Sequence, residues 1–200
     1  MTTNIYIKSY KAPEIDTNEI LRYAGAKSTD ESISKLLSEC IKEAKEKITY
    51  KACYVKLPIK ILDGTVDFGF QKVKSRSLAK LLFTSTHAVI FAATVGVNID
   101  RLAARYTSLS PSRALLLDAL GTERVESLAD LFCEELSGEF STVTARFSPG
   151  YGDLPLEFQK DIFSILDCPR KIGLTLNDSL IMSPRKSVTA IVGISDKKDF

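Results

Sequence analysis

The sequence has few of the residues that build metal centres and nucleophilic sites. It contains one histidine, His87, and the four cysteines Cys40, Cys53, Cys133 and Cys168, with no Cys-x-x-Cys pair. Because zinc sites require closely paired ligands, no metal site is predicted, and the cysteines are interpreted as buried structural thiols. A catalytic Cys–His pair is the alternative, but it would have to use His87, which nothing in the sequence orients.

Two nucleotide-binding patterns are also absent. The sequence contains neither Gly-x-Gly-x-x-Gly nor the phosphate-loop pattern Gly-x-x-x-x-Gly-Lys-Ser/Thr. Nucleotide-binding folds that depend on these glycine turns are therefore not expected.

Long apolar runs and an excess of one charge are lacking too. The most apolar run, 88–97, is too short to cross a bilayer, and residues 1–10 lack the apolar core of a signal peptide. The net charge is +2 and basic residues are interleaved with acids, which argues against nucleic acid and membrane partners. Together with the unpaired cysteines, these features predict a cytoplasmic protein.

The remaining composition is typical of one globular α+β domain spanning 1–200, with 44% hydrophobic and 26% charged residues. Helices are predicted at 17–24, 28–47, 75–83, 99–106, 111–136 and 156–166, from apolar periodicity and caps such as Ser110. Gly138 is expected to end the longest helix, and Pro169 to break the chain after the last one. Strands are predicted at 5–7, 53–57, 59–62, 66–68, 88–96, 174–176 and 188–194, with a hairpin turn at Asp63-Gly64. This irregular alternation indicates helices packed on a mostly antiparallel sheet.

The segment 146–155 is the most constrained turn of the chain. Two prolines and two glycines in ten residues favour a tight turn at which backbone can approach a ligand closely. Arg146 adds a planar cationic group, and Tyr151 a flat ring with a hydroxyl. An ordinary strand-to-helix loop with an incidental arginine explains these residues equally well.

Carboxylates collect on one side of the longest predicted helix. At about 100° per residue, Glu126, Asp130 and Glu134 lie close to Glu123 on the helix surface. A solvated face of an amphipathic helix explains this pattern. The alternative is that Glu126 and Asp130, one turn apart, hold a cationic ligand. A ligand that also contacts Arg146 would need an anionic group, and an α-amino acid with an extra positive charge satisfies both requirements.

The turn is one of several motifs that occur in a fixed order. The pattern Arg146-x-x-Pro149-Gly150-Tyr151-x-x-x-Pro155 is preceded by the acidic stretch 125–132 and by Thr-Val-Gly at 94–96. It is followed at 172–188 by a glycine, Leu-Asn-x-Ser, Met-x-Pro and Ser-Val. Together these motifs resemble the activation domain of cobalamin-dependent methionine synthase over about 88–194, and the first 85 residues match less clearly.

The resemblance implies a C-shaped α+β domain that binds S-adenosylmethionine and docks on a chain carrying cobalamin. At the matching positions, Arg146 would bind the carboxylate of S-adenosylmethionine, with Glu126 and Asp130 as acidic partners. The cofactor-binding backbone would come from Ser148, Pro149, Gly150 and Tyr151. Tyr151 would also face the cobalt cofactor, as the residue nearest to the catalytic step.

The sequence departs from the family pattern in several ways. It has no homocysteine, folate or cobalamin module and no cobalamin-binding Asp-x-His-x-x-Gly loop, so it is not expected to be a complete enzyme alone. The family's N-terminal aspartate has no assigned counterpart, and no tyrosine follows Tyr151.

Two functions remain open. The chain is either a separate activation subunit of a cobalamin-binding methionine synthase chain, with flavodoxin or another electron donor as a further partner, or a non-catalytic module that docks on a corrinoid protein and gates its cofactor. An ordinary S-adenosylmethionine-dependent methyltransferase is disfavoured, because its glycine-rich loop is absent and no general base lies near 146–155.

Overall fold

The computed structural model describes residues 4–26 and 30–195. The helices are α1 (Thr17–Tyr23), α2 (Glu31–Ala44), α3 (Arg76–Leu81), α4 (Val97–Tyr106), α5 (Pro111–Glu139), α6 (Phe158–Leu166) and α7 (Cys168–Ile172). The strands are β1 (Tyr6–Ser9), β2 (Lys51–Pro58), β3 (Lys60–Leu62), β4 (Thr65–Asp67), β5 (Lys72–Lys74), β6 (His87–Thr94), β7 (Thr142–Val143), β8 (Thr175–Leu176), β9 (Met182–Ser183) and β10 (Ser187–Ser195). The predicted α+β class is confirmed. The predicted start of α2 at Ser28 lies outside the described residues.

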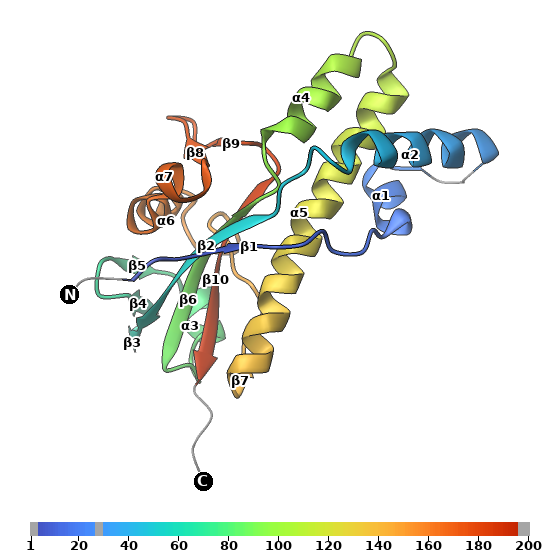
Figure 1. The fold of residues 1–200 in the computed structure, drawn as a ribbon. Coiled ribbons are helices and arrows are strands. Elements are labelled where there is room, and N and C mark those ends of the chain that lie inside the picture. The colour runs from blue at the N-terminus through green and yellow to red at the C-terminus, as the bar shows by residue number, and fades with distance from the viewer. Residues whose placement is uncertain (1–3, 27–29, 196–200) are drawn as a thin grey trace.

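Five strands form the central sheet, in the order β1-β2-β6-β10-β7 (Figure 1). Each described pairing in it is antiparallel. The middle strand β6 pairs over its whole length on both sides, so that Thr94 lies opposite Lys51 of β2 and Ser187 of β10. The sheet therefore joins segments from both halves of the chain.

Both faces of the sheet are covered by other elements. Successive residues of a strand point to opposite faces, and β6 is buried on both of them. Val89 and Phe91 pack in a core with α1, α2, α4 and α5. Ala88 and Ile90 pack in a second core with α3, α6, α7 and the small sheet β3-β4-β5. The central sheet is thus the middle layer of three.

The longest helix begins at Pro111 with Ser110 as its N-cap residue, as predicted, but its C-terminal end differs from the prediction. Gly138 does not end α5 but lies within it, and the helix stops at Phe140, which is extended and buried. Burial of this aromatic side chain, rather than a glycine cap, sets the end of the helix. Ser110 is the N-cap residue, but its side chain makes no capping bond. Its carbonyl accepts the first intrahelical bond, from the amide of Ala114 at 3.0 Å.

Glu123 is not on the solvated face of α5, contrary to the helical pattern. It is 2% exposed and forms an ion pair with Arg124, which is 1% exposed. Arg124 donates to the carbonyls of Pro13 and Glu14 at 2.7 and 2.5 Å. The amide of Asp16 donates to Glu123 at 3.2 Å. The segment between β1 and α1 therefore covers this pair, and burial is tolerated because both charges are hydrogen-bonded.

Two local predictions have different outcomes. The hairpin turn at Asp63-Gly64 is confirmed, with positive φ angles of 49° and 74° at its two residues. Pro169 was expected to break the chain, but it lies in the first turn of α7. A proline is accepted there because the first helical amides have no intrahelical partner to lose.

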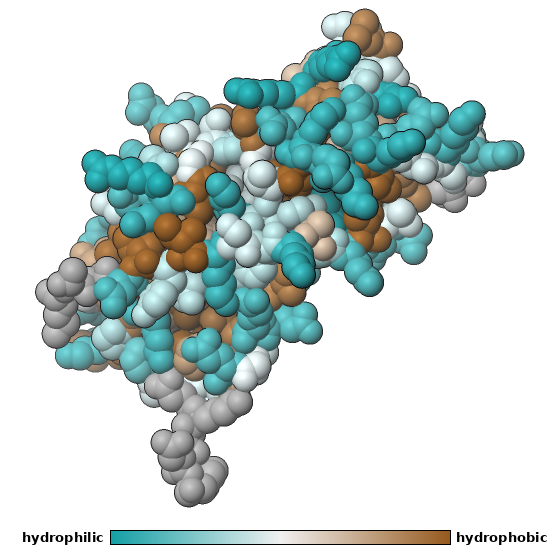
Figure 2. Space-filling view, in the orientation of Figure 1, coloured by the Kyte–Doolittle hydropathy of each residue, from teal (hydrophilic) through white to brown (hydrophobic). Residues whose placement is uncertain are grey.

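The cysteines are free thiols, and Cys40, Cys53 and Cys168 are buried as predicted, whereas Cys133 is partly exposed. The face of the molecule in Figure 2 is mainly hydrophilic, with apolar residues grouped near α7 and β1 and at the tip between α4 and α5. Leu109, in that tip, is 73% exposed. Over the described parts of the chain, no helix has the length and apolar character needed to cross a membrane.

Candidate functional site

A pocket of about 310 Å³ opens between α5, the 146–155 turn and the first residues of β10. Its lining residues are Glu126, Arg146, Ser148, Pro149, Tyr151, Gln159, Met182, Ser187, Val188 and Thr189. They come from helix, turn and strand segments that are distant in sequence. Their convergence depends on the central sheet, which places β10 beside the turn.

The turn is fixed by backbone hydrogen bonds at its start and along its length. Phe147 and Ile191 of β10 exchange two N–H···O bonds of 2.9 Å, so the turn leaves the sheet at a defined point. The amide of Tyr151 then donates to the carbonyl of Ser148 at 3.1 Å, and the amide of Gly150 donates to that of Leu154 at 3.0 Å. Gly150 has a φ of 88°, which only glycine adopts without strain.

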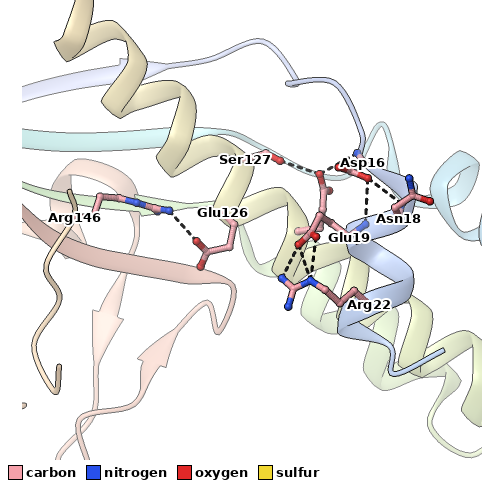
Figure 3. A network of polar contacts seen from close by, with 8 residues as sticks. Asp16, Asn18, Glu19, Arg22, Glu126, Ser127 and Arg146 are labelled. Carbon is pink, nitrogen blue, oxygen red and sulfur yellow. Dashed lines mark hydrogen bonds and ion pairs between the residues drawn. The ribbon is translucent and has the colours of Figure 1, made fainter. Parts of the chain in front are cut away.

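Three charged side chains meet at one wall of the pocket. Nη2 of Arg146 lies 3.1 Å from Oε2 of Glu126 (Figure 3). The same nitrogen lies 2.8 Å from Oδ1 of Asp130. Arg146 is 25% exposed, Glu126 42% and Asp130 71%. The two carboxylates are one turn apart on α5 and share one guanidinium nitrogen. The group carries a net charge of about −1.

A second polar network borders this wall on the side of α1. Asp16 caps α1 by accepting from the amides of Asn18 and Glu19 at 2.9 and 3.1 Å (Figure 3). The hydroxyl of Ser127, the neighbour of Glu126, donates to buried Glu123 at 2.8 Å. Burial and the negative charge of Glu126 raise the pKa of Tyr23 at the end of α1. The end of α1 therefore lies within reach of the charge of Glu126.

The predicted site residues are largely brought together. Five of them line the pocket, namely Glu126, Arg146, Ser148, Pro149 and Tyr151. Asp130 joins through its ion pair with Arg146. Gly150 contributes the turn geometry and not the pocket lining.

Five lining residues were not predicted as site residues. Gln159 comes from α6, Met182 from β9, and Ser187, Val188 and Thr189 from β10. Three of them, Met182, Ser187 and Val188, belong to the Met-x-Pro and Ser-Val motifs, which could have indicated them. Gln159 carries no sequence signal, because its place depends on how α6 packs.

The pocket combines charge, hydroxyl groups and apolar surface. Arg146 provides a fork suited to a carboxylate, and Glu126 and Asp130 suit ammonium or sulfonium groups. The remaining lining includes Val188, Met182 and the ring of Tyr151. Among the residues that the structure describes, no cluster of His, Cys, Asp or Glu could hold a metal ion. The arrangement fits binding of a zwitterionic small molecule with an apolar or aromatic part.

Fold and pocket together define an α+β domain with a pocket lined by charged side chains at one end of β10. Residues 83–200 match the family described as vitamin B12 dependent methionine synthase, activation domain, and the chain belongs to this family. A crystal structure of the MetH reactivation domain bound to AdoHcy is similar in fold, with a TM-score of 0.71 at 12% identity. The likeness covers 98% of this chain and 80% of that one. No curated protein matches the chain.

Proposed function

We propose that this chain is an activation subunit, which binds S-adenosylmethionine and supports the reductive remethylation of oxidised cobalamin on a separate methionine synthase chain. The observation that carries the proposal is the pocket in which Arg146 meets Glu126 and Asp130 beside the 148–151 turn. The family match supports it. So does the AdoHcy in the similar structure, since AdoHcy is S-adenosylmethionine without its transferable methyl group.

The charges of the pocket complement those of the ligand. The methionine end of S-adenosylmethionine carries one carboxylate and two positive groups, which sum to +1, against about −1 for the three pocket side chains. The ligand carboxylate would pair with Arg146, and the ammonium and sulfonium would pair with Glu126 and Asp130. Binding then exchanges one set of ion pairs for another, so that no charge is left unpaired.

The turn would hold the adenosine. Ser148 and Pro149 line the pocket without long side chains, and the positive φ of Gly150 shapes the turn behind them, which permits close approach. Tyr151 is 69% exposed at the rim, where we infer that it faces the cofactor of the partner chain. This sequence lacks the Asp-x-His-x-x-Gly loop, so its own residues are not suited to hold cobalamin. The cobalt, bound on the partner, would supply the methyl acceptor, and this chain would position the donor.

Calorimetry with S-adenosylmethionine tests the ligand. We expect binding by the wild type and a loss of about 10- to 100-fold in Arg146→Ala, which is roughly the 1.5–3 kcal/mol of a hydrogen bond to a charged group. Arg170→Ala is the matched control, because Arg170 is 86% exposed on α7 and pairs only loosely with Asp167 at 3.8 Å. Absence of binding at millimolar ligand would contradict the proposal.

The exposed ring of Tyr151 also fits the second function, a module that docks on a corrinoid protein and gates its cofactor. A cobalamin-loaded partner chain and S-adenosylmethionine with a labelled methyl group separate the two. Because remethylation of oxidised cobalamin consumes an electron, the assay includes flavodoxin or another donor. Transfer of the label that depends on this chain supports the activation subunit, whereas docking without transfer supports the gating module.

A further inference from the structure

The pocket turn is fastened to α3 by one carboxylate, that of Asp153. Its oxygens accept from the hydroxyl of Ser75 at 2.5 Å and from the amides of Arg76 and Ser77 at 2.7 and 3.2 Å. Ser75 is itself the N-cap of α3, since its hydroxyl accepts from the amide of Leu78 at 3.1 Å. These contacts join positions more than 70 residues apart, and α3 lies before the residues that match the family.

The neighbouring residue, Gly152, shows how closely the turn lies on α3. Its φ is 55°, and a Cβ at this position would be 3.1 Å from the Oγ of Ser77 and 3.5 Å from the ring of Phe147. A side chain at this position would be strained by the positive φ and would also require Ser77 or the turn to move slightly. Two consecutive residues, 152 and 153, thus hold the turn, and they directly follow the pocket residue Tyr151.

The backbone bonds within the turn connect this attachment to the pocket. The amide of Leu154 donates to the carbonyl of Tyr151 at 3.0 Å, and the carbonyl of Leu154 accepts from Gly150. Asp153 therefore lies between two residues whose backbone bonds close the turn. A displacement of Asp153 would also displace Gly150 and Tyr151, because these two backbone hydrogen bonds join them to the adjacent Leu154.

We propose that Asp153 is a positioning residue of the pocket, whose carboxylate holds the 148–151 wall against α3 in the geometry that binds the ligand. The proposal rests on the proposed function, because the ligand is the one inferred there. Asp153 does not line the pocket, so it acts through the turn. A turn that is already ordered costs less entropy when the ligand binds, and this raises affinity.

The charge state of Asp153 supports this role. The Ser75 hydroxyl and the two α3 amides lower the pKa of Asp153 to about 2. The carboxylate is therefore ionised throughout the physiological pH range.

Two measurements on Asp153→Ala and Asp153→Asn test the proposal. We expect Asp153→Ala to weaken S-adenosylmethionine about 10-fold, and Asp153→Asn less, because the amide oxygen can still accept one bond. In the ligand-free protein, hydrogen exchange should rise at the amides of 150–154 and stay unchanged in β6. Asp161→Ala is the matched control, since Asp161 accepts from the side chain of Gln71 at 3.1 Å and lies outside the pocket lining.

Three results would overturn the positioning role. One is unchanged ligand affinity in Asp153→Ala. Another is exchange that rises equally in β6, which would mean that the whole fold is destabilised. The third is an equal effect of Asp161→Ala. If the wild type itself binds no S-adenosylmethionine, the proposed function fails, and the exchange measurement in the free protein still decides whether Asp153 orders the turn.

Discussion

Arg146 is the side chain on which the charge balance of the pocket depends. Its two acidic partners differ in exposure, since Glu126 is 42% exposed and lines the pocket, whereas Asp130 is 71% exposed and does not. Solvent screens an exposed charge more strongly than a sheltered one. The two carboxylates should therefore contribute unequally to ligand binding.

The unequal contribution can be measured by neutralising each acid. We expect Glu126→Gln to weaken S-adenosylmethionine by about 10-fold, the effect of losing one charged hydrogen bond. Asp130→Asn should weaken it by less than about threefold, as for exposed ion pairs. Calorimetry of the two variants gives the comparison, and equal effects, or the reverse order, would show that the ligand does not approach Glu126 from inside the pocket.

The buried pair Glu123–Arg124 gives a prediction for stability. Replacing Arg124 by Met leaves Glu123 buried without its partner, and we expect a loss of about 3–5 kcal/mol in the free energy of unfolding. Urea denaturation measures it. Arg22→Ala is the control, because Arg22 forms a surface pair with Glu19 and is 62% exposed; it should cost less than about 1 kcal/mol. Similar losses in the two variants would contradict the buried character of the pair.

At the scale of elements, the link between the turn and α3 predicts a pH effect. Asp153 has a pKa of about 2 in the folded protein, below its ordinary value of 3.8. A depressed pKa stabilises the fold above about pH 4, and this stabilisation is lost as the pH falls towards 2. The difference in melting temperature between wild type and Asp153→Asn should therefore be larger at pH 7 than at pH 2.5. Other carboxylates are shared by both proteins, so a difference independent of pH would count against the link.

The sequence predicted the elements well wherever the pattern was local. The periodicity of α2 and α5 and the Asp63-Gly64 turn needed only neighbouring residues to be interpreted. The predictions were wrong where contacts between segments distant in sequence determine the local structure. Glu123 belongs to an acidic stripe by helical spacing, but the segment at 13–16 covers it. Gly138 is a helix stop by residue type, but the burial of Phe140 sets the end.

The candidate site was also predicted only in part, because sequence motifs reveal residues that are close together in the chain. Arg146 and the residues of its turn are adjacent in sequence, so a motif could reveal them. Gln159 and Thr189 reach the pocket only through the packing of α6 and β10, which no single-sequence pattern encodes. Asp153 falls at a position that the motif leaves unspecified, and its partner Ser75 lies in the part of the chain where the resemblance is weakest.

At the scale of the whole molecule, the region that matches the family does not contain the complete central sheet or both complete cores. The match begins at residue 83, yet β2 lies between β1 and β6, and α1 and α2 complete one core. We expect a fragment 83–200 to lack cooperative unfolding, because it exposes one edge of β6 and parts of both cores. Circular dichroism melting compares the fragment with the full chain, and a sharp transition near that of the full chain would contradict the expectation.

The order of strands in the central sheet has a consequence for synthesis of the chain. β6 is made before its neighbour β10, and α4 to α7 lie between them in the sequence. Until Ser187–Ser195 leaves the ribosome, one edge of a nearly all-apolar strand has no partner. Such an edge favours pairing with other nascent chains. Before β10 is made, α5 and α6 can cover the two faces of β6, but the edge that pairs with β10 stays open.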